Sequence, residues 1–196
     1  MPPPRARKPP LPQRRRGRPA KKPTGYFSGR YTSSSDSSAA GLVASEAPPT
    51  SQPLPGKADF VLLLKGPRRL LLLRDNRVLR DYEVALGKNP AGAKRRNGDG
   101  RTPEGRYLLD WRIEASRFYR AIHVSYPNEQ DKDFARRAGI FPGGGVMIHG
   151  LPEGESWVGD AHREFDWTNG CIGLTDDEMD EIWELVDDGT PIEIRP

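Results

Sequence analysis

Residues 58–87 read ADFVLLLKGPRRLLLLRDNRVLRDYEVALG, and this stretch decides the fold class. Two strongly apolar runs, 60–64 and 70–73, are separated by a Gly-Pro pair, and an Asp-Asn pair precedes a third run, 78–86. Short apolar runs bounded by turn residues are typical of strands, although a buried helix segment is the rival interpretation. We therefore expect three short strands, of which the last two form a hairpin.

Further strand patterns follow this stretch. Residues 87–105 are rich in glycine and read as a long loop with turns. Strands are expected near 107–113, 118–127, 146–148 and 191–195. The sequence therefore predicts a mostly β (α+β) domain.

Two segments carry helical signals. Residues 128–140 predict a short helix that ends at Gly139. The second helix is better defined, because Thr175 and Glu178 have the spacing of a capping box. One apolar stripe follows, made of Met179, Ile182, Trp183 and Val186. Gly189 fits the position directly after this helix.

Residues 1–56 differ sharply in composition from the rest of the chain. They hold 10 Lys/Arg and 2 Asp/Glu, a net charge of +8, whereas residues 57–196 hold 21 and 25, a net charge of −4. A Pro- and Ser-rich segment of this kind buries too little apolar surface to offset its ordering entropy. We expect a disordered basic tail and linker ahead of one domain at 57–196. The tail is either a solvated extension or a contact for a polyanion, and nucleic acid is unlikely because no binding motif accompanies the charges.

Membrane and export signals are weak in this sequence. No segment has the roughly 18 apolar residues of a membrane span. A secretory signal needs a basic start followed by an apolar run of about 7–15 residues, and only the basic start is recognisable. The single cysteine excludes an internal disulfide, so cysteine pairing does not indicate the compartment.

That single cysteine, Cys171, lies in the stretch DWTNGCIGLT at 166–175. A lone cysteine is most often a small buried apolar residue. Here it follows Gly170 and precedes the expected helix cap, where oriented backbone N–H groups would lower the thiol pKa and bind an oxyanion. Cys171 is therefore a candidate nucleophile.

A nucleophilic thiol needs a base, and the chain has three histidines. His149 is the strongest candidate, because it ends an apolar strand and precedes Gly150. His162 lies in a polar loop and is expected to face solvent. His123 points away from its apolar neighbours and could face a cleft. No closely spaced His/Cys pair suggests zinc, and we expect neither a metal nor a cofactor.

The segment MIHG at 147–150, followed by TNGCIGLT at 168–175, resembles the active-site motif of the L,D-transpeptidase (YkuD-like) catalytic domain. That motif is His-Gly, a gap, and Ser/Thr-X-Gly-Cys. Supporting segments occur in the right order: LLLLRDNRVLRDYEVALGKN at 70–89, DGRTPEGRYLL at 99–109 and DDGTPIEI at 187–194. The resemblance covers roughly residues 58–196 and is closer to the subgroup that includes YafK.

The resemblance implies a β-sandwich or barrel around a catalytic cysteine. Cys171 would be the nucleophile and His149 the base, with a backbone carbonyl near Gly150 orienting its ring. Thr168, Asn169 and Gly170 would shape the oxyanion and substrate region. The implied substrate is a peptidoglycan stem peptide, carbapenems are possible acylating agents, and the implied location is the cell envelope or periplasm.

Two positions depart from the commoner family pattern. Asn169 stands where a histidine is more frequent, and Gly173 stands where many members carry Arg or Asn. A carboxylate contact would then fall to another side chain, such as Arg163, unless Arg163 is only an exposed ion-pairing residue. Transfer to an amine, hydrolysis of wall-linked peptides and non-catalytic wall binding all stay open.

Overall fold

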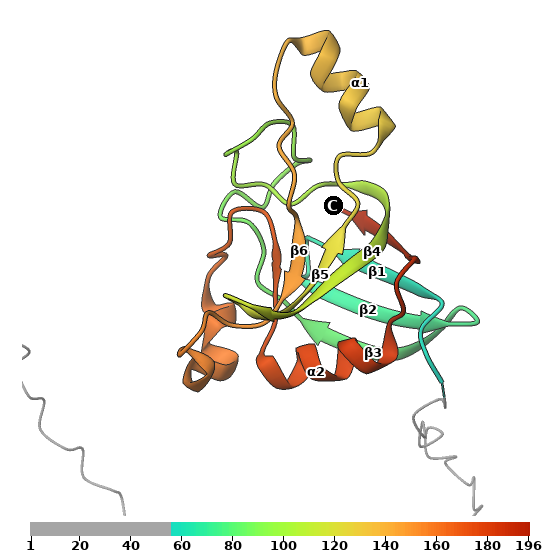
Figure 1. Ribbon diagram of the computed structural model, residues 1–196, viewed down its shortest axis with the longest axis vertical. Coiled ribbons are helices and arrows are strands. Elements are labelled where there is room, and N and C mark those ends of the chain that lie inside the picture. Colours follow the sequence, from blue (N-terminus) through green and yellow to red (C-terminus); the bar gives the residue numbers. More distant parts are fainter. Residues whose placement is uncertain (1–55) are drawn as a thin grey trace, which may run out of the picture. The chain divides into compact units, whose positions relative to one another are not determined.

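The computed structural model describes residues 56–196, which form a curled eight-stranded sheet with two α-helices and one 3₁₀ segment (Figure 1). The strands are β1 Phe60–Leu64, β2 Arg69–Arg74, β3 Arg77–Glu83, β4 Gly105–Ser116, β5 Tyr119–Val124, β6 Met147–His149, β7 Ile172–Gly173 and β8 Thr190–Arg195. The helices are α1 Glu129–Ala138 and α2 Asp176–Leu185, and the 3₁₀ segment η1 is Ser156–Glu164. The predicted mostly β class is confirmed. Apart from Gly56, the predicted tail lies outside the described residues.

The strand order is β3-β2-β1-β8-β4-β5-β6-β7. The pairs β1–β8 and β6–β7 are parallel, and the others are antiparallel. The predicted hairpin is confirmed: β2 pairs with β3 around Asp75 and Asn76, whose φ angles are 50° and 60°. Two successive residues with positive φ match the right-handed twist of the flanking strands, and Asp and Asn tolerate that conformation.

The two ends of the strand order meet, so the curled sheet closes toward a barrel. Ala85, just after β3, exchanges two backbone hydrogen bonds with Gly173 of β7, at 3.0 and 2.8 Å. A second bridge joins Gly87 to Thr168. The start of the glycine-rich loop therefore lies directly against the segment that carries Cys171.

Helix α2 covers one side of the sheet and contributes Met179 and Ile182 to the core (Figure 1). Its predicted capping box is present, because the Thr175 side chain accepts from the Glu178 backbone N–H while the Glu178 side chain reaches back. The prediction for Gly189 was wrong. The helix ends at Leu185, because the next residue is fully buried in extended backbone, and Gly189 belongs to the turn before β8.

Helix α1 matches its prediction and stands beyond the far end of the sheet (Figure 1). Asn128 and Asp131 form a capping box, and Gly139 ends the helix with a φ of 64°. The Tyr107 hydroxyl donates to the Asp131 carboxylate at 2.9 Å, which ties the helix to β4. Within residues 56–196, neither helix is long and apolar enough to cross a membrane.

The 3₁₀ segment η1 was missed in the sequence, where residues 159–167 read as a polar loop. Gly159 has a non-helical backbone inside the segment, so no regular apolar period marks it. The expectation of a solvent-facing His162 was also wrong. Its side chain is buried against Trp167, whose indole N–H approaches the His162 Nδ1 at 3.5 Å.

Candidate active site

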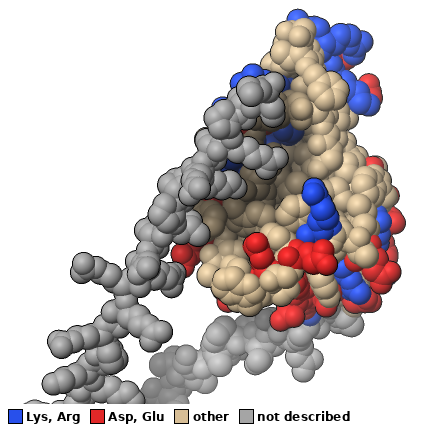
Figure 2. Space-filling model, turned by 60° about the vertical axis from the view of Figure 1, so that its left-hand side comes forward, with Lys and Arg blue, Asp and Glu red and all other residues tan. Residues whose placement is uncertain are grey.

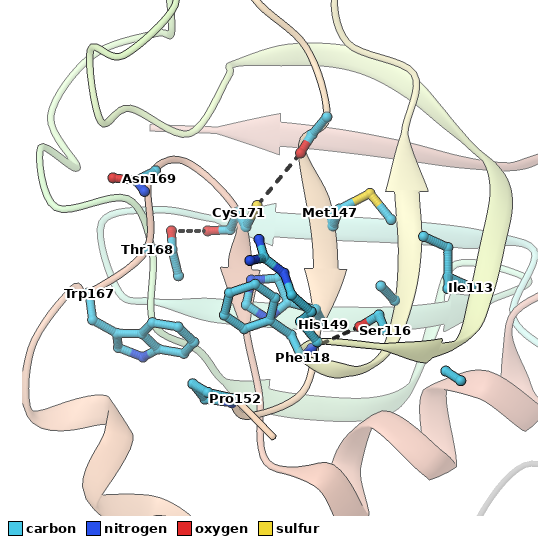
Figure 3. A pocket seen from close by; sticks show the side chains of 14 residues that line it. Ile113, Ser116, Phe118, Met147, His149, Pro152, Trp167, Thr168, Asn169 and Cys171 are labelled. Carbon is cyan, nitrogen blue, oxygen red and sulfur yellow. Dashed lines mark hydrogen bonds between the residues drawn. The ribbon is translucent and has the colours of Figure 1, made fainter. Parts of the chain in front are cut away.

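A cavity of about 640 Å³ lies between β4, β5, β6 and the turn that precedes β7 (Figure 3). Cys171, His149, Thr168 and Asn169 line it together. Aromatic and apolar side chains complete much of the wall, including Phe118, Met147 and Trp167. The fold thus brings the only cysteine and the favoured histidine into one cavity, because β6 and β7 are adjacent parallel strands.

His149 is the last residue of β6, and its side chain is 3% exposed. Its Nδ1 lies 2.7 Å from the carbonyl oxygen of Gly150, which can only accept, so Nδ1 carries the proton and Nε2 keeps a lone pair. Burial lowers the pKa of His149, and the ring is therefore neutral near neutral pH. The Phe118 ring lies over it, with centroids 4.6 Å apart.

Cys171 directly precedes β7 and is half-buried. Its thiol donates to the carbonyl oxygen of Gly145 at a sulfur–oxygen distance of 3.8 Å (Figure 3). Burial raises the pKa of the Cys171 thiol, and the opposing effects of the Met147 backbone and the Lys94 charge do not reverse this. The expectation of a lowered thiol pKa was wrong, because desolvation outweighs the oriented donors. The resting thiol therefore carries its proton.

Thr168 organises the turn that leads to the cysteine. Its hydroxyl donates to the Cys171 carbonyl at 2.8 Å and accepts from the Gly170 N–H at 3.1 Å. Gly170 has a φ of 128°, and a Cβ there would lie 2.5 Å from the Arg101 carbonyl oxygen. Only glycine fits both constraints. Asn169 is exposed at the cavity, and its side chain makes no hydrogen bond within residues 56–196.

A buried lysine holds the glycine-rich loop to the sheet. Lys65 donates to the carbonyls of Gly92 and Thr102 and to the Glu104 carboxylate, at 2.8, 3.0 and 2.8 Å. All three N–H groups of its ammonium are thus satisfied. The Thr102 hydroxyl in turn accepts from the Gly87 N–H at 3.2 Å. The Thr-Pro-Glu-Gly turn is therefore a structural anchor of this loop.

Asp99 organises the outer part of the same loop. Its carboxylate accepts from the Lys94 ammonium at 2.9 Å and from the backbone N–H groups of Arg95, Arg96 and Arg101. Burial alone would raise the pKa of Asp99, but these donors hold it at about 2. The loop packs against the turn that carries Cys171, because the Arg101 carbonyl lies close to Gly170. The glycines of the loop signalled turns but not this contact.

Gly173, one of the departures from the family pattern, is explained by its neighbour Trp167. A Cβ on Gly173 would lie 2.9 Å from the Trp167 ring. The indole occupies the space into which a side chain at 173 would point, and it walls the cavity as well. Sequence reasoning missed both Trp167 and Phe118 as wall residues. The only available signal was the position of Trp167 directly before the Thr168 motif.

Two predicted contact residues lie outside the cavity lining. His123 bonds to Asp110 at 2.7 Å and stacks on Trp111. Arg163 donates to Asp160 and Glu178, each at 2.5 Å, and to a backbone carbonyl. The structure therefore places neither side chain in the cavity lining, and their assignment to substrate contact stays a prediction.

Gly150 serves the site through its backbone carbonyl. A Cβ there would lie 2.5 Å from the Asp176 carboxylate. Within the part of the chain that the structure describes, no group of three or more His, Cys, Asp or Glu side chains is arranged to hold a metal ion.

Comparisons with known proteins agree with this architecture. A sequence model of the YkuD family, the L,D-transpeptidase catalytic domain, matches residues 59–194. YafK of Escherichia coli (strain K12), named provisionally as an L,D-transpeptidase, is 29% identical over 160 residues, covering 75% of this chain and 57% of YafK. The chain thus spans little more than half of that relative.

A solved structure also matches this chain over part of its length. Pgp2 of Campylobacter jejuni, a helical cell shape determining protein, superposes with a TM-score of 0.53 at 28% identity, covering 69% of this chain and 46% of Pgp2. Its K307A mutant gives a TM-score of 0.51 at 27% identity over the same shares. The chain belongs to the YkuD family of L,D-transpeptidase catalytic domains.

Proposed function

We propose that this domain is a cysteine L,D-transpeptidase that forms an acyl-enzyme on Cys171 from a peptidoglycan stem peptide and transfers the acyl group to an amine. One observation carries the proposal. His149, with Nδ1 anchored on the Gly150 carbonyl and Nε2 unprotonated, lines the same cavity as the Cys171 thiol. A neutral imidazole beside a protonated thiol is the resting state that general-base activation requires.

In the first half-reaction, His149 Nε2 takes the thiol proton while the sulfur attacks the carbonyl carbon of the donor residue. The amide C–N bond then breaks, and the imidazolium returns its proton to the amine of the leaving D-amino acid. A thioester on Cys171 results. We assign the exposed Asn169 amide as a donor to the oxyanion, since the Gly170 N–H already donates to Thr168.

In the second half-reaction, an acceptor amine attacks the thioester carbon. Its proton passes to His149 Nε2, the C–S bond breaks, and the departing sulfur takes that proton back. Water in place of the amine would make the same domain a hydrolase. The neutral resting pair serves either acceptor, because His149 has to accept a proton from the incoming nucleophile in both cases.

A role in wall remodelling follows from this chemistry. Pgp2 is described as determining helical cell shape, and we extend to this chain a function in building or reshaping the wall. Peptidoglycan as substrate would place the protein in the cell envelope. The basic segment at 1–56 supplies a charge that suits an anionic wall polymer.

The test is mass spectrometry of the intact protein after incubation with a carbapenem. The wild type should gain one adduct on Cys171, Cys171→Ala none, and His149→Ala should react much more slowly. His123→Gln is the matched control, because His123 lies outside the cavity lining, and it should react like the wild type. A folded wild type that gains no adduct refutes the proposal. Muropeptide products with and without an added amine then separate transfer from hydrolysis.

A further inference from the structure

Arg117 is the one Lys or Arg of residues 56–196 in the lining of the candidate-site cavity, and no Asp or Glu of these residues lines it. Arg117 lies in the β4–β5 turn, between Ser116 and Phe118, which Figure 3 labels. The remaining wall is mainly apolar and aromatic. A guanidinium at the edge of such a cavity favours an anionic ligand, because a desolvated anion needs a cationic donor.

The Arg117 guanidinium has no carboxylate partner in the described part of the chain. Its guanidinium carbon lies 6.0 Å from the centroid of the Phe118 ring. Two other basic side chains already form ion pairs. Arg120 pairs with Glu114 and Asp180, and Lys94 pairs with Asp99. In the space-filling view, a basic group stands beside the hollow of this face, and acidic side chains gather below it (Figure 2).

The backbone that carries Arg117 is fixed next to the histidine. The Arg117 carbonyl accepts from the Glu153 N–H at 2.9 Å, and the Ser116 hydroxyl accepts from the Phe118 N–H at 2.9 Å. Phe118 in turn packs on the His149 ring. Hydrogen bonds therefore hold the backbone of Arg117 in place beside His149. The N–H groups of its guanidinium are available to a ligand.

We propose that Arg117 binds a carboxylate of the donor peptide and so selects donors by their free carboxyl groups. This inference rests on the proposed function, which supplies a peptide substrate. A stem peptide that ends in a D-residue offers the terminal carboxylate, and a diamino diacid before it offers a second. The planar fork of arginine forms two parallel hydrogen bonds with either group.

The test measures binding in a Cys171→Ala background, where no turnover occurs. Three synthetic probes are compared by calorimetry: a stem tetrapeptide with the terminal and the diamino-diacid carboxylates free, one amidated at the terminal D-residue, and one amidated at the diamino diacid. Adding Arg117→Gln should weaken binding of the free peptide roughly tenfold or more. Arg117→Lys should keep part of the affinity. Arg137→Gln, an exposed change on α1, is the matched control and should have no effect.

One of the two amidations should weaken peptide binding by the Cys171→Ala protein but not by the protein that also carries Arg117→Gln. That amidation identifies the carboxylate that Arg117 binds. The inference is overturned if Arg117→Gln binds the free peptide as the parent does, or if both amidations weaken the two variants equally. Release of the D-amino acid by the wild-type protein is assayed separately. Its absence would refute the proposed function, while the binding comparison would still decide the role of Arg117.

Discussion

Replacing Asp99 by Asn tests the anchoring of the glycine-rich loop. The donors around the carboxylate hold the pKa of Asp99 at about 2 in the folded protein, against an ordinary value of 3.8. This difference corresponds to at most about 2.4 kcal/mol of unfolding free energy. Screening by solvent reduces it, so we expect Asp99→Asn to cost about 1–2 kcal/mol at neutral pH.

The sign of the pH dependence follows from the lowered pKa. The contribution of Asp99 is fully present above 3.8 and is lost as the pH falls from there to about 2. The stability difference between wild type and Asp99→Asn should therefore shrink over this range and vanish below it. Other carboxylates titrate in both proteins alike, so the difference isolates Asp99.

The assay is urea unfolding followed by tryptophan fluorescence, at several values from about pH 7 to about pH 2. Asp133→Asn on the exposed face of α1 is the control, and its cost should stay near zero, as for other exposed ion pairs. A difference for Asp99→Asn that is absent at neutral pH, or constant down to the lowest pH, would refute the reasoning. Asp99→Asn should also slow acylation of Cys171, because the same loop supports its turn.

Three further predictions concern the site and its support. The rate of acylation by a carbapenem should fall as the pH is lowered, with its midpoint below pH 6.5. Burial lowers the pKa of His149, and only the neutral ring accepts a proton. A midpoint of the rate profile above pH 6.5 would contradict this. Gly170→Ala should cost about 1–3 kcal/mol in thermal unfolding, from backbone strain and the Arg101 carbonyl. Gly98→Ala, also at positive φ but with open space around it, should cost less. Thr175→Ala should cost about 1 kcal/mol in urea unfolding through loss of the helix cap.

Local patterns in the sequence determined the strands of the first half and the capped C-terminal helix. The apolar runs at 60–64 and 70–73 became β1 and β2, and Thr175 and Glu178 cap α2 as their spacing predicted. These features depend on neighbours within a few residues. The same holds for the motif around Cys171, whose glycine and threonine shape one turn.

Tertiary structure alone decided how the site is closed and charged. Ala85 forms backbone hydrogen bonds with Gly173, which lies 88 positions further along the chain. This pairing places the loop that contains Asp99 next to the turn of Cys171. The pKa of the Cys171 thiol is raised by burial, and burial cannot be read from the local sequence pattern. Arg117 lies in the β4–β5 turn and lines the cavity because β5, which begins after this turn, pairs with β6. Desolvation and contacts between distant segments exist only once the sheet has curled, so the sequence named the reactive residues while the fold set their environment.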